Sequence, residues 1–175
     1  MVTGEELVSK TKKTFDNPLV EMKSEYEASV REVTTLEERQ KKVLFHSQRV
    51  NATVEDLLNA AKNFSSPTNV RVFKERYPII VETKKKINDL LSEIKTVIIP
   101  NLQKKMDVLG KLIDEHGQKM ANIDEFKKEV EGQYNKIESA NMFIEEANKF
   151  LTDMDGKIFP HKAKIRELGL EKRDF

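Results

Sequence analysis

Apolar side chains recur at alternating steps of three and four residues along three long stretches of the chain. An alternation that is sustained over so many turns is typical of helices that pack in a coiled coil. Asn17 and Pro18 open the first stretch as a helix cap and first helical residue, and the turn-forming sequence SSPTN closes it at 65–69. The apolar seam of this stretch consists of Leu19, Met22, Tyr26, Ser29, Val33, Leu36, Gln40, Val43, Ser47, Val50, Val54, Leu57, Ala61 and Phe64.

The third stretch repeats this spacing and carries a second apolar line beside its seam. The seam consists of Ile123, Phe126, Val130, Gln133, Ile137, Ala140, Ile144, Ala147, Leu151, Met154, Ile158, His161, Ile165 and Leu168. The second line consists of Phe143, Phe150 and Phe159. The expected helices cover residues 18–64, 68–116 and 123–168, each about 70 Å long at 1.5 Å per residue. Because the connections are short, neighbouring helices should be antiparallel, which predicts an all-α three-helix coiled coil in a single domain, 1–175.

The middle stretch contains a change of phase and a proline. Three successive steps of four residues would swing its buried stripe by about 120° around the helix axis. They join Ile94, Ile98, Leu102 and Met106. Pro100 lies inside this swing and cannot donate a hydrogen bond to the carbonyl of Thr96, so we expect a helix kink at Pro100. Pro78 either kinks the helix as well or marks its true start, and the sequence leaves both open.

A thin bundle of three helices has little interior in which to hide the second apolar line. Burial between two copies of the chain is the simplest solution, since an exposed line would form a large apolar patch. The predicted dimer interface consists of Phe73, Tyr77, Phe143 and Phe150. The alternative is that these aromatic residues fill the core of a single chain.

Composition and charge exclude several classes of function. The chain has 35% charged residues and no cysteine, which excludes disulfides and thiolate chemistry. No apolar run is long enough to span a membrane, and the first residues lack the apolar core of a secretory signal, so we expect a cytoplasmic protein. Residues 68–113 contain ten Lys or Arg against five Asp or Glu, a net charge of +5 within a chain of net charge +1.

The residues that usually carry catalysis are missing or scattered. The sequence has no glycine-rich phosphate loop and no nucleophile elbow. His46, His116 and His161 lie on three different segments without acids at ligand spacing, so no metal or other cofactor is expected. Nucleic-acid binding is disfavoured because aromatic residues do not alternate with cations. We expect a protein that is not an enzyme.

In its three long helices and its proline-containing middle helix, the chain resembles a BAR domain of the amphiphysin and endophilin class. IIPNLQKKMDVLGKLIDEHGQKMANIDEFKKEVE resembles the second helix, the tip and the start of the third helix in that family. IESANMFIEEANKFLTDMDGKIFPHKAKI resembles the third helix, and LVEMKSEYEASVREVTTLEERQKKV the first. The resemblance implies a kinked, crescent-shaped homodimer that binds anionic bilayers at the membrane periphery and senses or induces curvature. It also implies a role in endocytosis and membrane trafficking, with cytoskeletal or endocytic proteins as further partners.

The membrane-binding residues that the resemblance implies are cations of the middle helix and the tip. They are Lys85, Lys86, Lys95, Lys104, Lys105, Lys111, Lys119, Lys127 and Lys128. Each cation close to an anionic membrane contributes on the order of 1 kcal/mol. Residues 1–17 form a candidate short amphipathic helix that either inserts into the membrane or extends the bundle.

The competing hypothesis is a structural or protein-interaction coiled-coil rod, cytoskeletal or adaptor, without lipid binding. Asp114 and Glu115 favour it because they stand at the tip, where BAR domains usually carry cations. The absence of tryptophan and of an internal repeat argues against a spectrin-like rod. Both hypotheses remain open at the level of the sequence.

Overall fold

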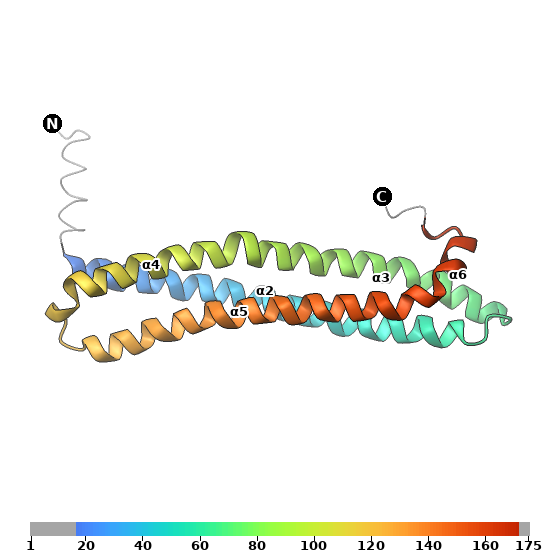
Figure 1. Cartoon of the computed structure of the whole chain (residues 1–175), viewed down its shortest axis with the longest axis horizontal. Helices are drawn as coiled ribbons and strands as arrows, with labels where there is room; N and C mark the ends of the chain where they lie inside the picture. Colours follow the sequence, from blue (N-terminus) through green and yellow to red (C-terminus); the bar gives the residue numbers. More distant parts are fainter. Residues whose placement is uncertain (1–16, 172–175) are drawn as a thin grey trace, which may run out of the picture. The chain divides into compact units, whose positions relative to one another are not determined.

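The computed structural model describes residues 17–171, and this part of the chain is helical and contains no β-strand (Figure 1). Its elements are α2 (Pro18–Ala61), α3 (Pro67–Glu93), the π-helical turn η1 (Ile94–Ile98), α4 (Ile99–His116), the 3₁₀ turn η2 (Gly117–Lys119), α5 (Ile123–Ile158), the 3₁₀ turn η3 (Phe159–His161) and α6 (Lys162–Glu167). Because α3, η1 and α4 follow one another directly, the chain forms three long helical stretches. The all-α class and the three long helices are thereby confirmed. The candidate amphipathic helix at the N-terminus lies outside the described residues, apart from Asn17.

The first two long helices begin at the residues that suit a helix start. The backbone N–H of Leu19 donates to Asn17 Oδ1 at 3.2 Å, and Pro18 occupies the first helical position, where its missing N–H costs nothing. The backbone N–H of Asn69 donates to Ser66 Oγ at 3.4 Å, and Pro67 follows the cap in the same way. Since α3 starts at Pro67, Pro78 lies inside this helix and does not mark its beginning.

The third helix ends earlier than the apolar spacing indicates. The sequence predicts one helix over 123–168, whereas α5 stops at Ile158 and a 3₁₀ turn, Phe159–His161, separates it from α6. Pro160 explains the interruption, because proline donates no hydrogen bond and disfavours a helical conformation in the residue before it. Ile165 is still buried, so the apolar spacing remains valid beyond the break.

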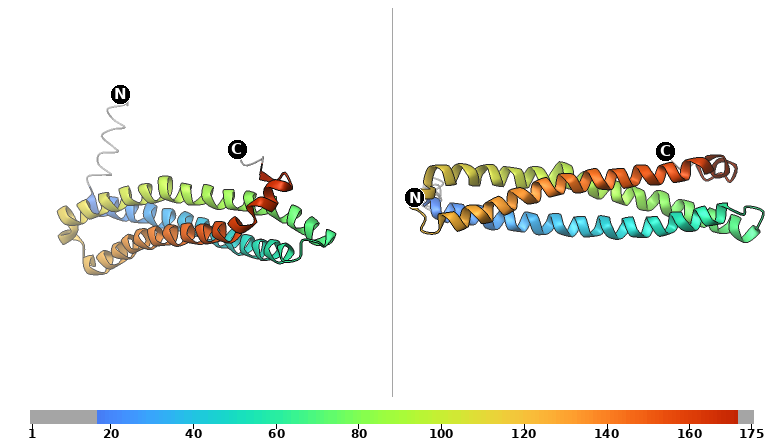
Figure 2. Two further views of the ribbon diagram at one scale, coloured as in Figure 1. Left: turned by 45° about the vertical axis from the view of Figure 1, so that its right-hand side comes forward. Right: turned by 60° about the horizontal axis from the view of Figure 1, so that its bottom comes forward.

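The chain packs as two compact units, which are described separately. Of the described residues, unit 1 comprises 17–37 and 94–141, and unit 2 comprises 38–93 and 142–171. Within unit 1, parts of α2 and α5 lie side by side with α4, and within unit 2 the other parts of α2 and α5 lie side by side with α3 (Figures 1 and 2). Met22, Leu36, Leu102, Met106 and Leu109 are fully buried in unit 1. Val43, Leu57, Phe73, Ile80 and Ile87 are fully buried in unit 2. No member of the two long predicted seams is exposed.

The expected swing of the buried stripe in the middle helix is largely absent. Ile94, Ile98, Leu102 and Met106 are all at most 3% exposed, so the stripe stays in the core of unit 1. The π-helical turn Ile94–Ile98 accounts for this, because a turn with one residue more than an α-turn takes up part of the extra spacing. Pro100 follows this turn as the second residue of α4, inside one continuous helical stretch.

Two of the polar residues within the predicted seams meet inside unit 1. Gln133 Nε2 donates to Ser29 Oγ at 3.4 Å, and Ser29 Oγ donates to the backbone carbonyl of Tyr26 at 2.6 Å. Both side chains are buried. The pair therefore satisfies two polar groups that would be costly if either were buried alone.

Candidate functional site

The nine lysines assigned to a membrane from the sequence are divided between the two units. Lys85 and Lys86 belong to unit 2, and the other seven belong to unit 1. All are exposed except Lys105, which is half-buried. The seven in unit 1 are Lys95, Lys104, Lys105, Lys111, Lys119, Lys127 and Lys128, and none of them forms an ion pair with another described residue.

The basic unit is not the one that holds most of the predicted lysines. Over its described residues, unit 1 has 10 Lys and Arg residues against 13 Asp and Glu residues, a net charge of −3. The described residues of unit 2 have 16 against 13, a net charge of +3. The exposed Asp114 and Glu115 contribute to the negative charge beside the η2 turn. Attraction to an anionic surface is therefore expected from unit 2 more than from unit 1.

Unit 2 carries two large apolar side chains in an exposed position on α2. Phe45 is 61% exposed and Leu44 is 53% exposed, whereas Val43 and Val50 of the same helix are buried. Lys41, Lys42 and Arg49 flank them and are exposed as well. We call this surface the basic–aromatic patch, defined as Lys41, Lys42, Leu44, Phe45 and Arg49 of α2 together with Lys86 of α3.

His46 connects the α2 part of the patch to α3. Its ring lies edge-on to that of Phe45, with 5.5 Å between the ring centroids. Burial lowers the pKa of His46, and the nearby charges of Lys86, Arg49 and Lys42 lower it further. Lys42 and Arg49 lie on α2 and Lys86 lies on α3, and all three are exposed. The patch is thus a shared surface of α2 and α3 within unit 2.

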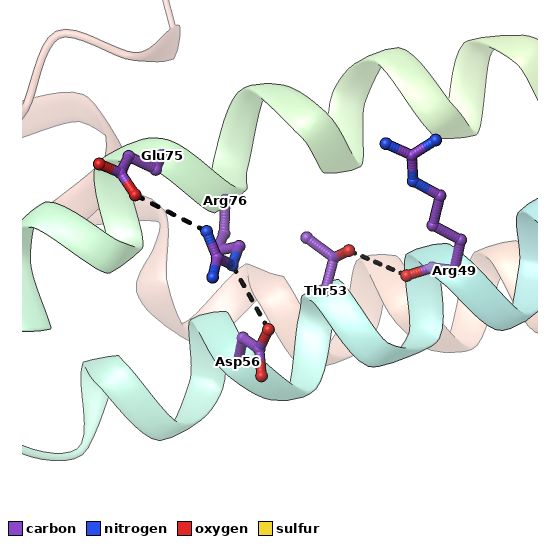
Figure 3. A network of polar contacts seen from close by, with 5 residues as sticks. All are labelled: Arg49, Thr53, Asp56, Glu75 and Arg76. Atoms are coloured by element: carbon purple, nitrogen blue, oxygen red, sulfur yellow. Dashed lines mark hydrogen bonds and ion pairs between the residues drawn. The ribbon is translucent and has the colours of Figure 1, made fainter.

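Two acids of unit 2, Asp56 and Glu75, pair with Arg76, whereas the exposed Glu38 lies one helical turn before Lys41 and Lys42. Arg76 Nε donates to Asp56 Oδ2 at 3.4 Å and Arg76 Nη1 lies 3.7 Å from Glu75 Oε2 (Figure 3). The carbonyl of Arg49 accepts a hydrogen bond from Thr53 Oγ1 at 2.9 Å, and its guanidinium forms no ion pair with a described residue. Lys86 lies 3.6 Å from Glu82, an exposed pair that water screens. Lys41, Lys42 and Arg49 form no ion pair with a described residue, so three of the four patch cations are unpaired.

Five of the six patch residues were not predicted from the sequence. Val43 and Ser47 belong to the predicted buried seam, whereas Leu44 and Phe45 lie outside it. The signal that reveals the patch is a pair of large apolar residues outside the apolar stripe, flanked by Lys41-Lys42 and Arg49. A helix that packs on one side only has polar residues outside its apolar stripe, and Leu44 and Phe45 do not fit that pattern.

One of the four predicted interface residues belongs to the core of a single chain. Phe73 is 0% exposed and its ring packs edge-on against Phe64, with 5.2 Å between the centroids. It offers no surface to a second chain, so its assignment to a dimer interface is corrected in favour of the alternative. Tyr77, Phe143 and Phe150 are half-buried and keep an accessible side.

Outside the patch, the titratable groups with shifted pKa values include two tyrosines of unit 1. In the part of the chain that the structure describes, no three His, Cys, Asp or Glu residues are placed to hold a metal ion. Burial raises the pKa of Tyr134, with Asp107 and Asp114 adding to the effect, and its hydroxyl donates to the carbonyl of Met106 at 2.7 Å. Burial also raises the pKa of Tyr26, helped by Glu129. Both tyrosines therefore stay protonated at neutral pH and act in packing.

Among residues 17–171, no helix has the length and apolar character needed to cross a membrane. Residues 17–171 form two all-α units, and unit 2 carries the basic–aromatic patch on its surface. Comparisons with protein-family models, with curated proteins and with solved structures find no match. The function is accordingly argued from the residues of this chain.

Proposed function

We propose that this protein is a non-catalytic helical scaffold that binds anionic lipid bilayers from one side through the basic–aromatic patch of unit 2. The observation that carries the proposal is the exposure of Leu44 and Phe45 among four cations. Apolar side chains flanked by Lys and Arg suit the boundary between headgroups and acyl chains, where the ring is buried and the cations meet phosphate.

The cations of the patch can contribute to the free energy of binding to an anionic bilayer. Cations near an anionic leaflet contribute about 1 kcal/mol each, within a screening length of about 10 Å at 0.1 M salt. Burying the accessible part of Phe45 and Leu44 adds an apolar contribution that salt does not screen. High salt should therefore weaken binding, because it screens the cations. Removal of the Phe45 ring alone should weaken binding without abolishing it, because the cations remain.

The proposal includes the homodimer and crescent that the resemblance to BAR domains implies. It is supported in unit 2 by the exposure of Met142 and Phe159, at 55% and 69%, and by the accessible sides of the half-buried Phe143 and Phe150. Two copies that share such a surface would remove it from water. We expect Phe143→Asp with Phe150→Asp to sediment as a monomer, whereas Phe45→Asp stays dimeric. A wild-type chain that is monomeric at high concentration would contradict the dimer.

The second candidate function is a protein-interaction rod without lipid affinity. The observation that favours it is the net charge of −3 of unit 1, which holds seven of the nine lysines that the resemblance implies. An acidic surface repels an anionic bilayer and attracts basic protein segments. This candidate would be preferred if no vesicle binding occurs at low salt.

Co-sedimentation with vesicles that contain anionic lipid tests the proposal. We expect Lys41→Glu with Lys42→Glu to weaken binding at least tenfold, and Phe45→Ser to weaken it by a smaller factor. The matched control is Lys127→Glu with Lys128→Glu, which makes the same change of charge on α5 of unit 1 and should leave affinity within about twofold. Equal losses for both lysine pairs, or a loss confined to the control, would contradict the assignment of the patch.

A further inference from the structure

Unit 2 contains a pocket between α3 and the segment that follows α6, and the proposed membrane function does not use it. Its volume is about 550 Å³, within the usual range for sites that bind small molecules. Its lining consists of Lys74, Tyr77, Pro78, Val81, Glu82, Lys85, Leu168, Gly169 and Leu170. The pocket shares no residue with the basic–aromatic patch.

One wall of the pocket is fixed by the way α6 ends. The backbone N–H of Leu170 donates to the carbonyl of Ile165 at 3.1 Å, and that of Gly169 donates to the carbonyl of Arg166 at 3.0 Å. These two bonds define a Schellman motif, and Gly169 adopts the positive φ of 71° that the motif requires. Ile165 is buried, so the wall formed by Leu168 and Leu170 is anchored to the core of unit 2.

The floor of the pocket is an apolar face of α3. Tyr77, Pro78 and Val81 lie within about one turn of one another on this helix. A proline in a helix interior costs about 3 kcal/mol or more, because it removes a hydrogen bond and clashes with the preceding turn. Pro78 lines this floor, so a residue that is costly inside a helix forms part of the pocket surface.

Two lysines stand at the ends of the floor. Lys74 and Lys85 are eleven residues apart, which corresponds to about 16 Å along the helix. Both are exposed, and neither forms an ion pair with another described residue. Among the residues that the structure describes, Glu82 is the one acid that lines the pocket, and it lies 3.6 Å from Lys86. The charge at the rim of this apolar recess is therefore positive.

We propose that this pocket binds a free single-chain anionic amphiphile, such as a fatty-acid anion, with its chain on the apolar floor and its head at Lys74 or Lys85. The apolar lining selects the hydrocarbon chain, and the uncompensated lysines select a carboxylate or a phosphate over a neutral or cationic head. A polar anion without a chain would leave the floor exposed, and a neutral alkane would leave the lysines unused.

Calorimetric titration with sodium dodecanoate, kept below its micellar concentration, tests this inference. We expect saturable binding of one molecule per chain, whereas the dodecyltrimethylammonium cation, which has the same chain, should bind at least tenfold more weakly. Lys74→Gln with Lys85→Gln should lower the affinity for dodecanoate at least tenfold. Lys127→Gln with Lys128→Gln removes the same charge from unit 1 and should not change it.

A second variant tests the apolar floor, and thermal melts confirm that every variant is folded. Val81→Glu places a carboxylate on the floor and should abolish dodecanoate binding. The inference is overturned if dodecanoate does not bind, if both probes bind equally, or if the Lys74/Lys85 variant binds like its control. Phe45→Ser should retain dodecanoate binding, so failure of the membrane proposal and failure of this one can be told apart.

Discussion

His46 is a residue whose environment differs from that of an ordinary surface histidine. Its side chain is half-buried, and Nδ1 has no hydrogen-bond partner among the described residues. Protonation would add a positive charge next to Lys42, Arg49 and Lys86, and burial opposes that charge most strongly. The folded protein therefore keeps this imidazole neutral at a pH where the unfolded chain already binds a proton.

This difference predicts a pH-dependent stability. The unfolded pKa of histidine is about 6.5, and the folded pKa of His46 lies below it. The stabilising contribution is thus fully present above about pH 6.5 and is lost as the pH falls below the unfolded pKa toward the folded one. We expect the unfolding free energy from urea titrations to decline across this window, and to decline less steeply in His46→Gln.

His161→Gln should act in the same direction, because burial and Lys164 also lower the pKa of His161. Urea titrations of the two single variants and of the double variant at a series of pH values separate the two histidines. A slope in His46→Gln that equals the wild-type slope would show that His46 titrates alike in both states.

At the scale of elements, three glycines inside helices have different surroundings. A Cβ added to Gly132 or Gly156 of α5 would meet no atom within 4 Å. A Cβ added to Gly110 of α4 would lie 3.2 Å from the hydroxyl oxygen of Tyr134. Because that hydroxyl donates to the carbonyl of Met106, Gly110 makes room for a hydrogen bond between α4 and α5 within unit 1.

Alanine substitutions should separate these roles. We expect Gly132→Ala and Gly156→Ala each to raise the unfolding free energy by about 0.5–1 kcal/mol, since glycine weakens a helix by that amount. Gly110→Ala should gain less, because it displaces the tyrosine hydroxyl. In a Tyr134→Phe background its gain should match the other two, as measured by urea denaturation of the double-mutant cycle. An equal gain at all three glycines in the wild-type background would argue against the contact.

The helices themselves could largely be predicted from the sequence, because their apolar residues have to face a common core. Asn17 and Pro18 set the start of α2 by local chemistry, and so the prediction there was correct. The π-helical turn at Ile94–Ile98 was not predicted, since the spacing of four residues shows a mismatch but not how the backbone resolves it. The early end of α5 was missed because the apolar spacing continues across Pro160.

At the scale of the whole molecule, charge has to be counted over residues that pack together. The stretch 68–113 is the basic one along the sequence, yet its two parts fall into different units. Residues 38–61 contribute Lys41, Lys42 and Arg49 to the same unit as α3, and this sum makes unit 2 basic. Periodicity does not reveal such a grouping, because it depends on which helical segments are neighbours. The candidate surface was therefore found only when the packing was known.

The most direct test of the proposed function is to measure whether Phe45 enters a bilayer. The chain contains no tryptophan, so Phe45→Trp introduces a single fluorescent reporter into the patch. Val108→Trp is the matched control, because Val108 is also exposed but lies on α4 of unit 1. Both variants are mixed with anionic and with neutral vesicles.

The account predicts that anionic vesicles shift the emission of the tryptophan at position 45 to the blue and protect it from a water-soluble quencher. Both effects should diminish between about 0.1 and 1 M salt, as the Debye length falls from about 10 to about 3 Å. The control should show neither effect. An unchanged spectrum at position 45 in the presence of anionic vesicles, or a shift confined to position 108, would contradict the account.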